Sequence, residues 1–162
     1  MKIKFFTTGG TIDKIYFDAK SEFQVGPPQV TDLLRDANVT CEHEIESILR
    51  KDSLDLTDAD RALIRDRIAA DPATRVVVTH GTDTMVQTAL VLRGIPGKTI
   101  VLTGSMQPAR LRVTDAAFNL GTAVVAAQTL PPGVYLAMNG QIFDPATTRK
   151  NVASHCLSLI HI

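Results

Sequence analysis

The stretch IKFFTTGGTID, residues 3–13, sets the architecture of the chain. Its first half is apolar and rich in Phe and Ile, which is typical of a buried β-strand. Two glycines flanked by threonines follow, and glycine permits a sharp turn and the close approach of a ligand to the backbone. A buried strand that runs straight into such a turn indicates a sheet whose loops carry the function.

Similar apolar runs recur along the chain and predict five strands. We expect them at residues 3–7, 41–49, 75–79, 99–103 and 133–139, which are rich in Val, Ile and Phe. The runs VVV at 76–78 and IVL at 100–102 are apolar without alternation. Parallel strands that are covered on both faces have this pattern.

Helical patterns fill the segments between these strands. Residues 30–37 place apolar side chains at helical spacing, and Thr57 with Asp60 forms a capping-box pattern that opens a helix to about residue 70. Residues 84–93 and 113–129 predict two more helices, which end at a glycine and at two prolines. Strands that alternate with helices predict a doubly wound, mainly parallel α/β sheet, a three-layer sandwich of the Rossmann or flavodoxin type.

The composition favours one domain that acts on a small molecule. The chain has 162 residues, 44% of them apolar, and 17 basic residues balance 17 acidic ones without a block of like charge. We therefore expect no nucleic-acid or membrane partner. The first apolar run falls short of a signal-peptide core of about 7–15 residues, so we expect a cytoplasmic protein. The two cysteines and four histidines lack metal-ligand spacing, so no metal or cofactor is expected.

In a sheet of this kind, ligands bind beyond the carboxyl ends of the strands. The first loop there holds TTGGT, and a later one holds HGTDT, residues 80–84. Taken alone, the first fits an ordinary turn, and Thr82 or Asp83 fits a helix N-cap. If the two strands are neighbours, two hydroxyls and a carboxylate share one cleft, where backbone amides can stabilise an oxyanion. This outlines an acyl-transfer site.

A threonine hydroxyl is a weak nucleophile unless a nearby group takes its proton. Tyr16, Asp83 and Lys150 are the groups available for that role. His80 is expected to orient its turn rather than to act as the base, because no sequence partner marks it as catalytic.

These motifs resemble the signatures of the bacterial-type L-asparaginases. TGGTI at 8–12 is similar to the first signature and THGTDT at 79–84 to the second. Further similar segments follow in the same order over nearly the whole chain: DSLD at 52–55, GSMQP at 104–108, DAAFNL at 115–120, MNG at 138–140, then Asp144 and Lys150. The resemblance implies a short single-domain form in which residues 1–155 match the family's N-terminal domain. Residues 156–162 are then a tail of uncertain role, which we hypothesise to be truncated or non-native.

The resemblance implies an enzyme that hydrolyses L-asparagine to L-aspartate and ammonia without a metal or cofactor. It implies that Thr11 is the nucleophile and that Thr82, Asp83 and Lys150 form a second triad around the same carbonyl. Tyr16 is the candidate for the loop tyrosine that assists Thr11 in this family.

The resemblance also implies how the substrate is held. Asp83 is expected at the α-ammonium group and Ser53 at the α-carboxylate, with Asp52 and Thr82 in the same substrate site. Met106, Gln107, Pro108 and Asn119 are expected to be scaffolding of the cleft. A homo-oligomer, a dimer or tetramer, is implied because the family closes its sites at subunit contacts.

Three features depart from the family pattern. Phe23 stands where the two-domain members have their loop tyrosine, so Tyr16 has to substitute for it. Leu54 stands where the family often has a polar side chain that reaches the ligand. The second domain of the larger members has no counterpart in this sequence.

Four other functions fit parts of this sequence pattern. A glutaminase-asparaginase of broader specificity shares the two threonine loops, and Phe23 and Leu54 favour a catalytically silent amino-acid-binding module. An ammonia-producing amidotransferase subunit also resembles the family, but it carries extra domains for tRNA. A signalling receiver domain would use Asp83 and Lys150, but it needs acidic magnesium ligands after the first strand, where this chain has threonine and glycine.

Overall fold

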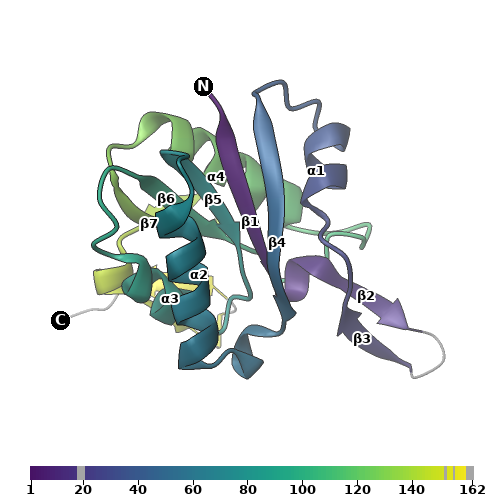
Figure 1. Ribbon diagram of the computed structural model, residues 1–162. Helices are drawn as coiled ribbons and strands as arrows, with labels where there is room; N and C mark the ends of the chain where they lie inside the picture. The colour runs from purple at the N-terminus through teal and green to yellow at the C-terminus, as the bar shows by residue number, and fades with distance from the viewer. Residues whose placement is uncertain (18–20, 152, 155, 160–162) are drawn as a thin grey trace.

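The computed structural model describes residues 1–17, 21–151, 153–154 and 156–159, and its core is a twisted six-stranded sheet (Figure 1). The strand order is β4-β1-β5-β6-β7-β8. The five parallel strands are β1 (Ile3–Gly9), β4 (His43–Lys51), β5 (Arg75–Thr79), β6 (Thr99–Thr103) and β7 (Gly133–Met138), and β8 (Gln141–Phe143) pairs antiparallel with β7. This order is that of the flavodoxin-like sheets, which confirms the predicted doubly wound fold.

Helices cover both faces of this sheet. Figure 1 shows α2 (Asp58–Ala70) and α3 (Met85–Leu92) in front of it and α4 (Ala116–Thr129) behind it, and α1 (Val30–Asp36) packs in the same core as α4. Alternate strand residues serve the two cores: Val76 and Val78 pack in the core of α2 and α3, whereas Val77 packs in that of α1 and α4. All three valines are fully buried, as their unbroken apolar run predicts.

The predicted capping box opens α2. Thr57 Oγ1 accepts a hydrogen bond from the Asp60 amide at 3.2 Å, and the Asp60 carboxylate accepts one from the Thr57 amide at 2.9 Å. These bonds satisfy two of the amides that a helix leaves free at its N-terminus. No helix among the described residues is long and apolar enough to span a bilayer.

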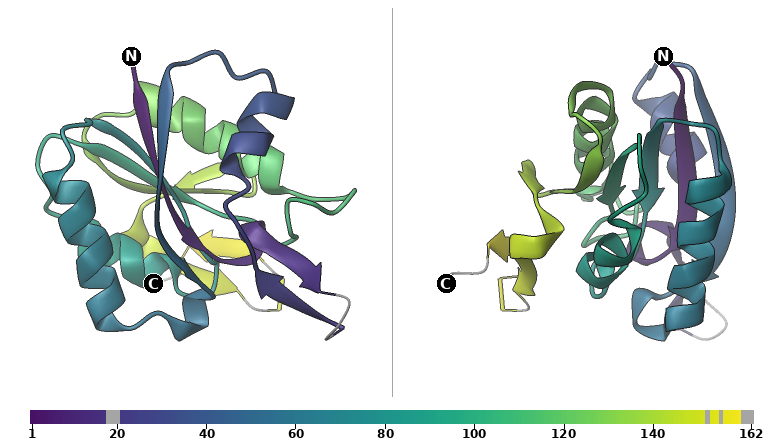
Figure 2. Two further views of the ribbon diagram at one scale, coloured as in Figure 1. Left: turned by 45° about the vertical axis from the view of Figure 1, so that its right-hand side comes forward. Right: turned by 60° about the vertical axis from the view of Figure 1, so that its left-hand side comes forward.

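Several short strands are additions to the predicted set. β2 (Lys14–Phe17) and β3 (Glu22–Val25) form an antiparallel hairpin, which projects from the end of β1 (Figure 2, left). β9 (Thr148–Asn151) pairs with β10 (Cys156–Leu159), so the described residues of the segment expected to be a tail lie in a strand. The expected strands 3–7 and 41–49 lie at 3–9 and 43–51, because pairing with neighbours extends the first and shifts the second.

Candidate active site

Loops from the carboxyl ends of β1, β4 and β5 meet at one edge of the sheet. Gly10 has a φ of 89°, a conformation that favours glycine, and a Cβ atom there would overlap the amide of Gly81. A Cβ atom on Gly81 would in turn lie 2.6 Å from the Ser53 side chain. The glycines of the two motifs therefore let three loops touch, as the neighbouring positions of β1 and β5 require.

Lys150 joins the second motif from a distant part of the chain. Its Nζ donates to Thr82 Oγ1 at 2.9 Å and pairs with Asp83 Oδ1 at 2.5 Å. Lys150 lies on β9, whereas Thr82 and Asp83 lie in the turn before α3. The lysine side chain is 16% exposed and that of Asp83 is 40% exposed, so water reaches the pair from the Asp83 side. The structure thus brings together the three residues that the sequence analysis grouped.

Ser53 and Asp52 follow β4 and begin the short helix η3 (Ser53–Asp55). The Ser53 hydroxyl is fully buried and has no hydrogen-bond partner within the described part of the chain. The Asp52 carboxylate accepts a bond from the Leu54 amide at 3.2 Å and pairs with Lys14 Nζ at 2.7 Å. Burial alone would raise the pKa of Asp52, but these partners keep it below its usual value. Asp52 is therefore engaged by protein groups, while the Ser53 hydroxyl has no partner among the residues that the structure describes.

The first motif places Thr11 at the start of the short helix η1 (Thr11–Asp13), directly after the Gly10 turn. Tyr16 lies on the hairpin, is 52% exposed, and makes an edge-on contact with the ring of Phe23 at 5.5 Å between centroids. Within the described residues, no hydrogen bond joins Tyr16 to Thr11. Gly10, the residue before Thr11, thus lies against Gly81 of the second motif, and Tyr16 lies on the adjoining hairpin.

His80 is fully buried and makes two hydrogen bonds. Its Nδ1 lies 2.7 Å from the Gly81 carbonyl oxygen, which can only accept, so Nδ1 carries the proton. Nε2 then accepts from Thr88 Oγ1 at 2.8 Å. Burial lowers the pKa of His80 to about 4. The imidazole is neutral at physiological pH, and both of its nitrogens are used to hold the turn.

The loop after β6 is held by two residues at the start of α4. Asp115 accepts hydrogen bonds from the amides of Met106 and Gln107 at 2.9–3.1 Å. Asn119 donates to the Gly104 carbonyl at 3.0 Å and accepts from the Asn139 amide at 3.1 Å. Asn119 thus holds the loops after β6 and β7 together, in keeping with the scaffolding role expected of it.

Two residues next to the first motif were missed by the sequence analysis. Lys14 pairs with Asp52, and the fully buried carboxylate of Asp13 accepts a hydrogen bond from the Gln29 amide at 2.8 Å. Burial raises the pKa of Asp13 to about 6. The one available signal was the presence of charged residues directly after an apolar strand and turn. Across the described residues, no three His, Cys, Asp or Glu side chains are grouped closely enough to bind a metal ion.

The fold and the site define an α/β protein that gathers threonine hydroxyls, a carboxylate and a lysine at the carboxyl edge of a flavodoxin-like sheet. The chain belongs to the asparaginase family, since the family description "Asparaginase, N-terminal" matches residues 2–159.

Known relatives agree with this assignment. The chain is 36% identical over 137 residues to the glutaminase-asparaginase of Acinetobacter glutaminasificans, covering 79% of this chain and 39% of that protein. It is 34% identical over 152 residues to the L-asparaginase of Thermococcus kodakarensis, covering 88% of this chain and 45% of that one. The solved structure of L-asparaginase I from Vibrio cholerae superposes with a TM-score of 0.85 at 30% identity, covering 98% of this chain and 51% of that one. The chain therefore spans about half the length of these relatives, or less.

Proposed function

We propose that the protein hydrolyses the side-chain amide of L-asparagine to give L-aspartate and ammonia, without a metal or cofactor. The observation that carries this proposal is the contact of Lys150 with both Thr82 and Asp83 beside the paired glycine turns. Membership of the asparaginase family supports the same reaction.

In the proposed reaction, the Thr11 hydroxyl attacks the side-chain amide carbon and loses its proton. We propose that backbone amides of the two glycine turns stabilise the oxyanion that forms; the Gly10 amide is not one of them, because it donates to the Lys51 carbonyl at 2.9 Å. The C–N bond then breaks, and the nitrogen leaves as ammonia with the proton that Thr11 gave up, which Tyr16 is proposed to relay. Water hydrolyses the resulting ester on Thr11, which releases L-aspartate and restores the hydroxyl. Thr82, held by Lys150, positions this water or relays a proton.

Tyr16 is the proposed partner of Thr11. It is paired across the hairpin with Phe23, the position at which the larger family members have their tyrosine. Side chains that face each other across an antiparallel pair lie on the same face, and the two rings are in contact. We therefore propose that the Tyr16 hydroxyl, on the same face of the hairpin, serves in place of one at position 23.

The substrate's charged groups have two matching sites. Within the described residues, Lys150 contacts Oδ1 of Asp83 and leaves Oδ2 to accept from an α-ammonium group. The buried, unpartnered hydroxyl of Ser53 can donate to an α-carboxylate. Asp52 contributes by holding the loop that carries Ser53.

The proposal includes a cytoplasmic homo-oligomer, a dimer or tetramer. The uncharged helix α4 exposes Phe118 and Val125, an apolar surface that a second copy of the chain would cover. The free cysteines Cys41 and Cys156 suit a reducing compartment. Light scattering of the purified protein would give the mass that tests the oligomer.

A broader glutaminase-asparaginase activity is the second candidate, since one relative carries that name. Discrimination against one extra methylene is worth only about 1–3 kcal/mol, so the two activities readily coexist in one site. A silent amino-acid-binding module is the third candidate, because Leu54 is highly exposed and offers the ligand no polar group.

Ammonia release from L-asparagine and L-glutamine by the purified chain tests these candidates. We expect release from L-asparagine at a higher kcat/KM than from L-glutamine. Comparable values would favour the broader activity. If a folded chain releases no ammonia but L-aspartate still raises its Tm, the binding module is correct instead.

A further inference from the structure

Asp13 is a buried carboxylate beside Thr11, and none of the roles described above uses it. Its side chain is only 1% exposed. Oδ1 accepts from the Gln29 amide at 2.8 Å, and Oδ2 is buried without a partner in the described part of the chain. Because a buried carboxylate with an unpaired oxygen destabilises a fold, its position calls for a functional explanation.

Asp13 lies at the base of the β2–β3 hairpin. Its carbonyl oxygen accepts from the Gly26 amide at 2.8 Å, just beyond the terminal strand pair Lys14 and Val25. Its own amide donates to the Gly10 carbonyl at 3.1 Å. Asp13 therefore connects the glycine turn, the residue that follows β3 and the residue before α1. The hairpin projects away from the sheet beyond this base (Figure 2), so the base sets its direction.

The loop after β6 also contacts the segments on either side of the hairpin base. The Ala109 amide donates to the carbonyl of Ile12 at 3.1 Å, and Arg110 Nε donates to Gln29 Oε1 at 2.9 Å. The charged groups around Asp13 are Arg50, at the end of β4, whose charge favours the ionised carboxyl, and Arg110, which acts through Gln29. Lys14, the next residue, is paired with Asp52.

We propose that Asp13 is a positioning residue for the hydrolysis, whose carboxylate holds the base of the β2–β3 hairpin and thereby aims Tyr16 at Thr11. The inference rests on the proposed function, in which Tyr16 assists Thr11. The bond from Gln29 needs only one acceptor oxygen. An asparagine at this position can supply that oxygen, and an alanine cannot.

Asp13→Ala and Asp13→Asn test the proposal, with Glu22→Gln as a control that replaces an exposed carboxyl on the same hairpin. We expect Asp13→Ala to lower kcat for L-asparagine by about 10- to 100-fold with little change in KM, since small misplacements of a reacting group have effects of this size. Asp13→Asn restores most of the activity, and Glu22→Gln matches wild type. Equal loss in the alanine and asparagine variants would overturn the proposal.

A double-mutant cycle separates positioning from general damage. If Asp13 acts through Tyr16, then Asp13→Ala adds no further loss once Tyr16→Phe is in place. Losses that multiply would mean that Asp13 acts elsewhere.

A spectroscopic measurement keeps the test independent of the proposed reaction. The chain has two tyrosines and no tryptophan, so Tyr135→Phe leaves Tyr16 as the only tyrosine. In that background, Asp13→Ala should increase the quenching of Tyr16 fluorescence by acrylamide, and Asp13→Asn should not. This result is expected even if the chain releases no ammonia. Unchanged quenching in a folded alanine variant refutes the proposal.

Should Asp13→Ala fail to fold, Gln29→Pro removes the same bond from the donor side. Gln29→Ala is its matched control, since it loses the side-chain contacts but keeps the amide. Greater quenching of Tyr16 in the proline variant alone supports the proposal, and equal quenching in both contradicts it.

Discussion

Among single residues, Lys150 links two segments that are far apart in the sequence. It donates to Thr82 and pairs with Asp83 across 68 and 67 positions of the chain. Sequence patterns cannot supply such a contact, because it depends on where β9 docks. The resemblance to a known family grouped these three residues, and the structure supplies the physical reason for the grouping.

Replacing Lys150 tests the role of that contact in proton transfer. We expect Lys150→Met to lower kcat for L-asparagine by about 100-fold or more, the range typical of a lost acid-base group. Arg149→Met, which removes an exposed cation from the neighbouring position of the same strand, is the control and should retain wild-type rates. Ammonia release measures both variants. Similar rates in the two would remove Lys150 from the mechanism.

The raised pKa of Asp13 predicts how stability depends on pH. Its pKa rises from 3.8 in the unfolded chain to about 6 in the folded one, so stability falls as pH rises through this interval. At most about 3 kcal/mol is lost by pH 7, from 1.36 kcal/mol for each pKa unit. Urea unfolding from pH 4 to 7 should show that the free energy of unfolding of Asp13→Asn increases relative to that of wild type as pH rises. Two parallel stability curves would contradict this expectation.

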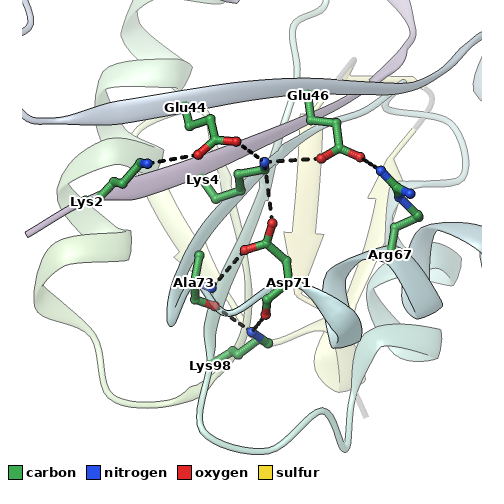
Figure 3. A network of polar contacts seen from close by, with 8 residues as sticks. All are labelled: Lys2, Lys4, Glu44, Glu46, Arg67, Asp71, Ala73 and Lys98. Carbon is green, nitrogen blue, oxygen red and sulfur yellow. Dashed lines mark hydrogen bonds and ion pairs between the residues drawn. The ribbon is translucent and has the colours of Figure 1, made fainter.

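Among the elements, β1, β4 and the end of α2 are joined by an ion cluster at the amino edge of the sheet (Figure 3). Lys4 Nζ lies 2.7 Å from Glu44, 3.1 Å from Glu46 and 3.4 Å from Asp71. Burial alone would lower the pKa of Lys4, but the three carboxylates raise it above its usual value. The lysine side chain is 7% exposed. Glu44 and Glu46 also pair with Lys2 and Arg67, whereas Asp71 pairs with Lys4 alone within the described residues.

Removing Lys4 is therefore expected to destabilise the fold without changing the chemistry. Lys4→Met should lower the free energy of unfolding by about 1–3 kcal/mol, because Asp71 loses its paired cation while Glu44 and Glu46 keep Lys2 and Arg67. Lys2→Met removes a half-exposed partner of Glu44, so a much smaller loss of stability is expected. Urea unfolding measures both, and kcat should stay at the wild-type value while the protein is folded. Equal stabilities of the two variants would refute this.

The elements also differ in how far the sequence predicts them. Strands β5 and β6 have the predicted bounds because their apolar runs are buried on both faces. The strand Thr148–Asn151, TRKN, lacks an apolar side chain and becomes a strand through pairing with β10. The β2–β3 hairpin likewise depends on its ties to Gly10 and Gln29. Local propensity contains no signal for contacts of this kind.

For the whole molecule, the sheet order explains why distant motifs form one site. β1 and β5 are neighbours in the sheet although β1 ends at Gly9 and β5 ends at Thr79, 70 positions later in the chain. The Lys4 ion cluster lies at the amino ends of the strands, whereas the candidate active site lies at their carboxyl ends. The sequence predicted the doubly wound class correctly. It did not predict how Asp13 and Lys14 tie the first motif to its neighbours.

The proposed mechanism requires the hydroxyl groups of both Thr11 and Thr82. Thr11→Ala and Thr82→Val should each reduce ammonia release from L-asparagine by at least about 100-fold, with both proteins folded by circular dichroism. Thr40→Val, an exposed threonine in the loop before β4, is the matched control and should leave the rate unchanged. Wild-type rates in either active-site variant would contradict a mechanism that uses both hydroxyls.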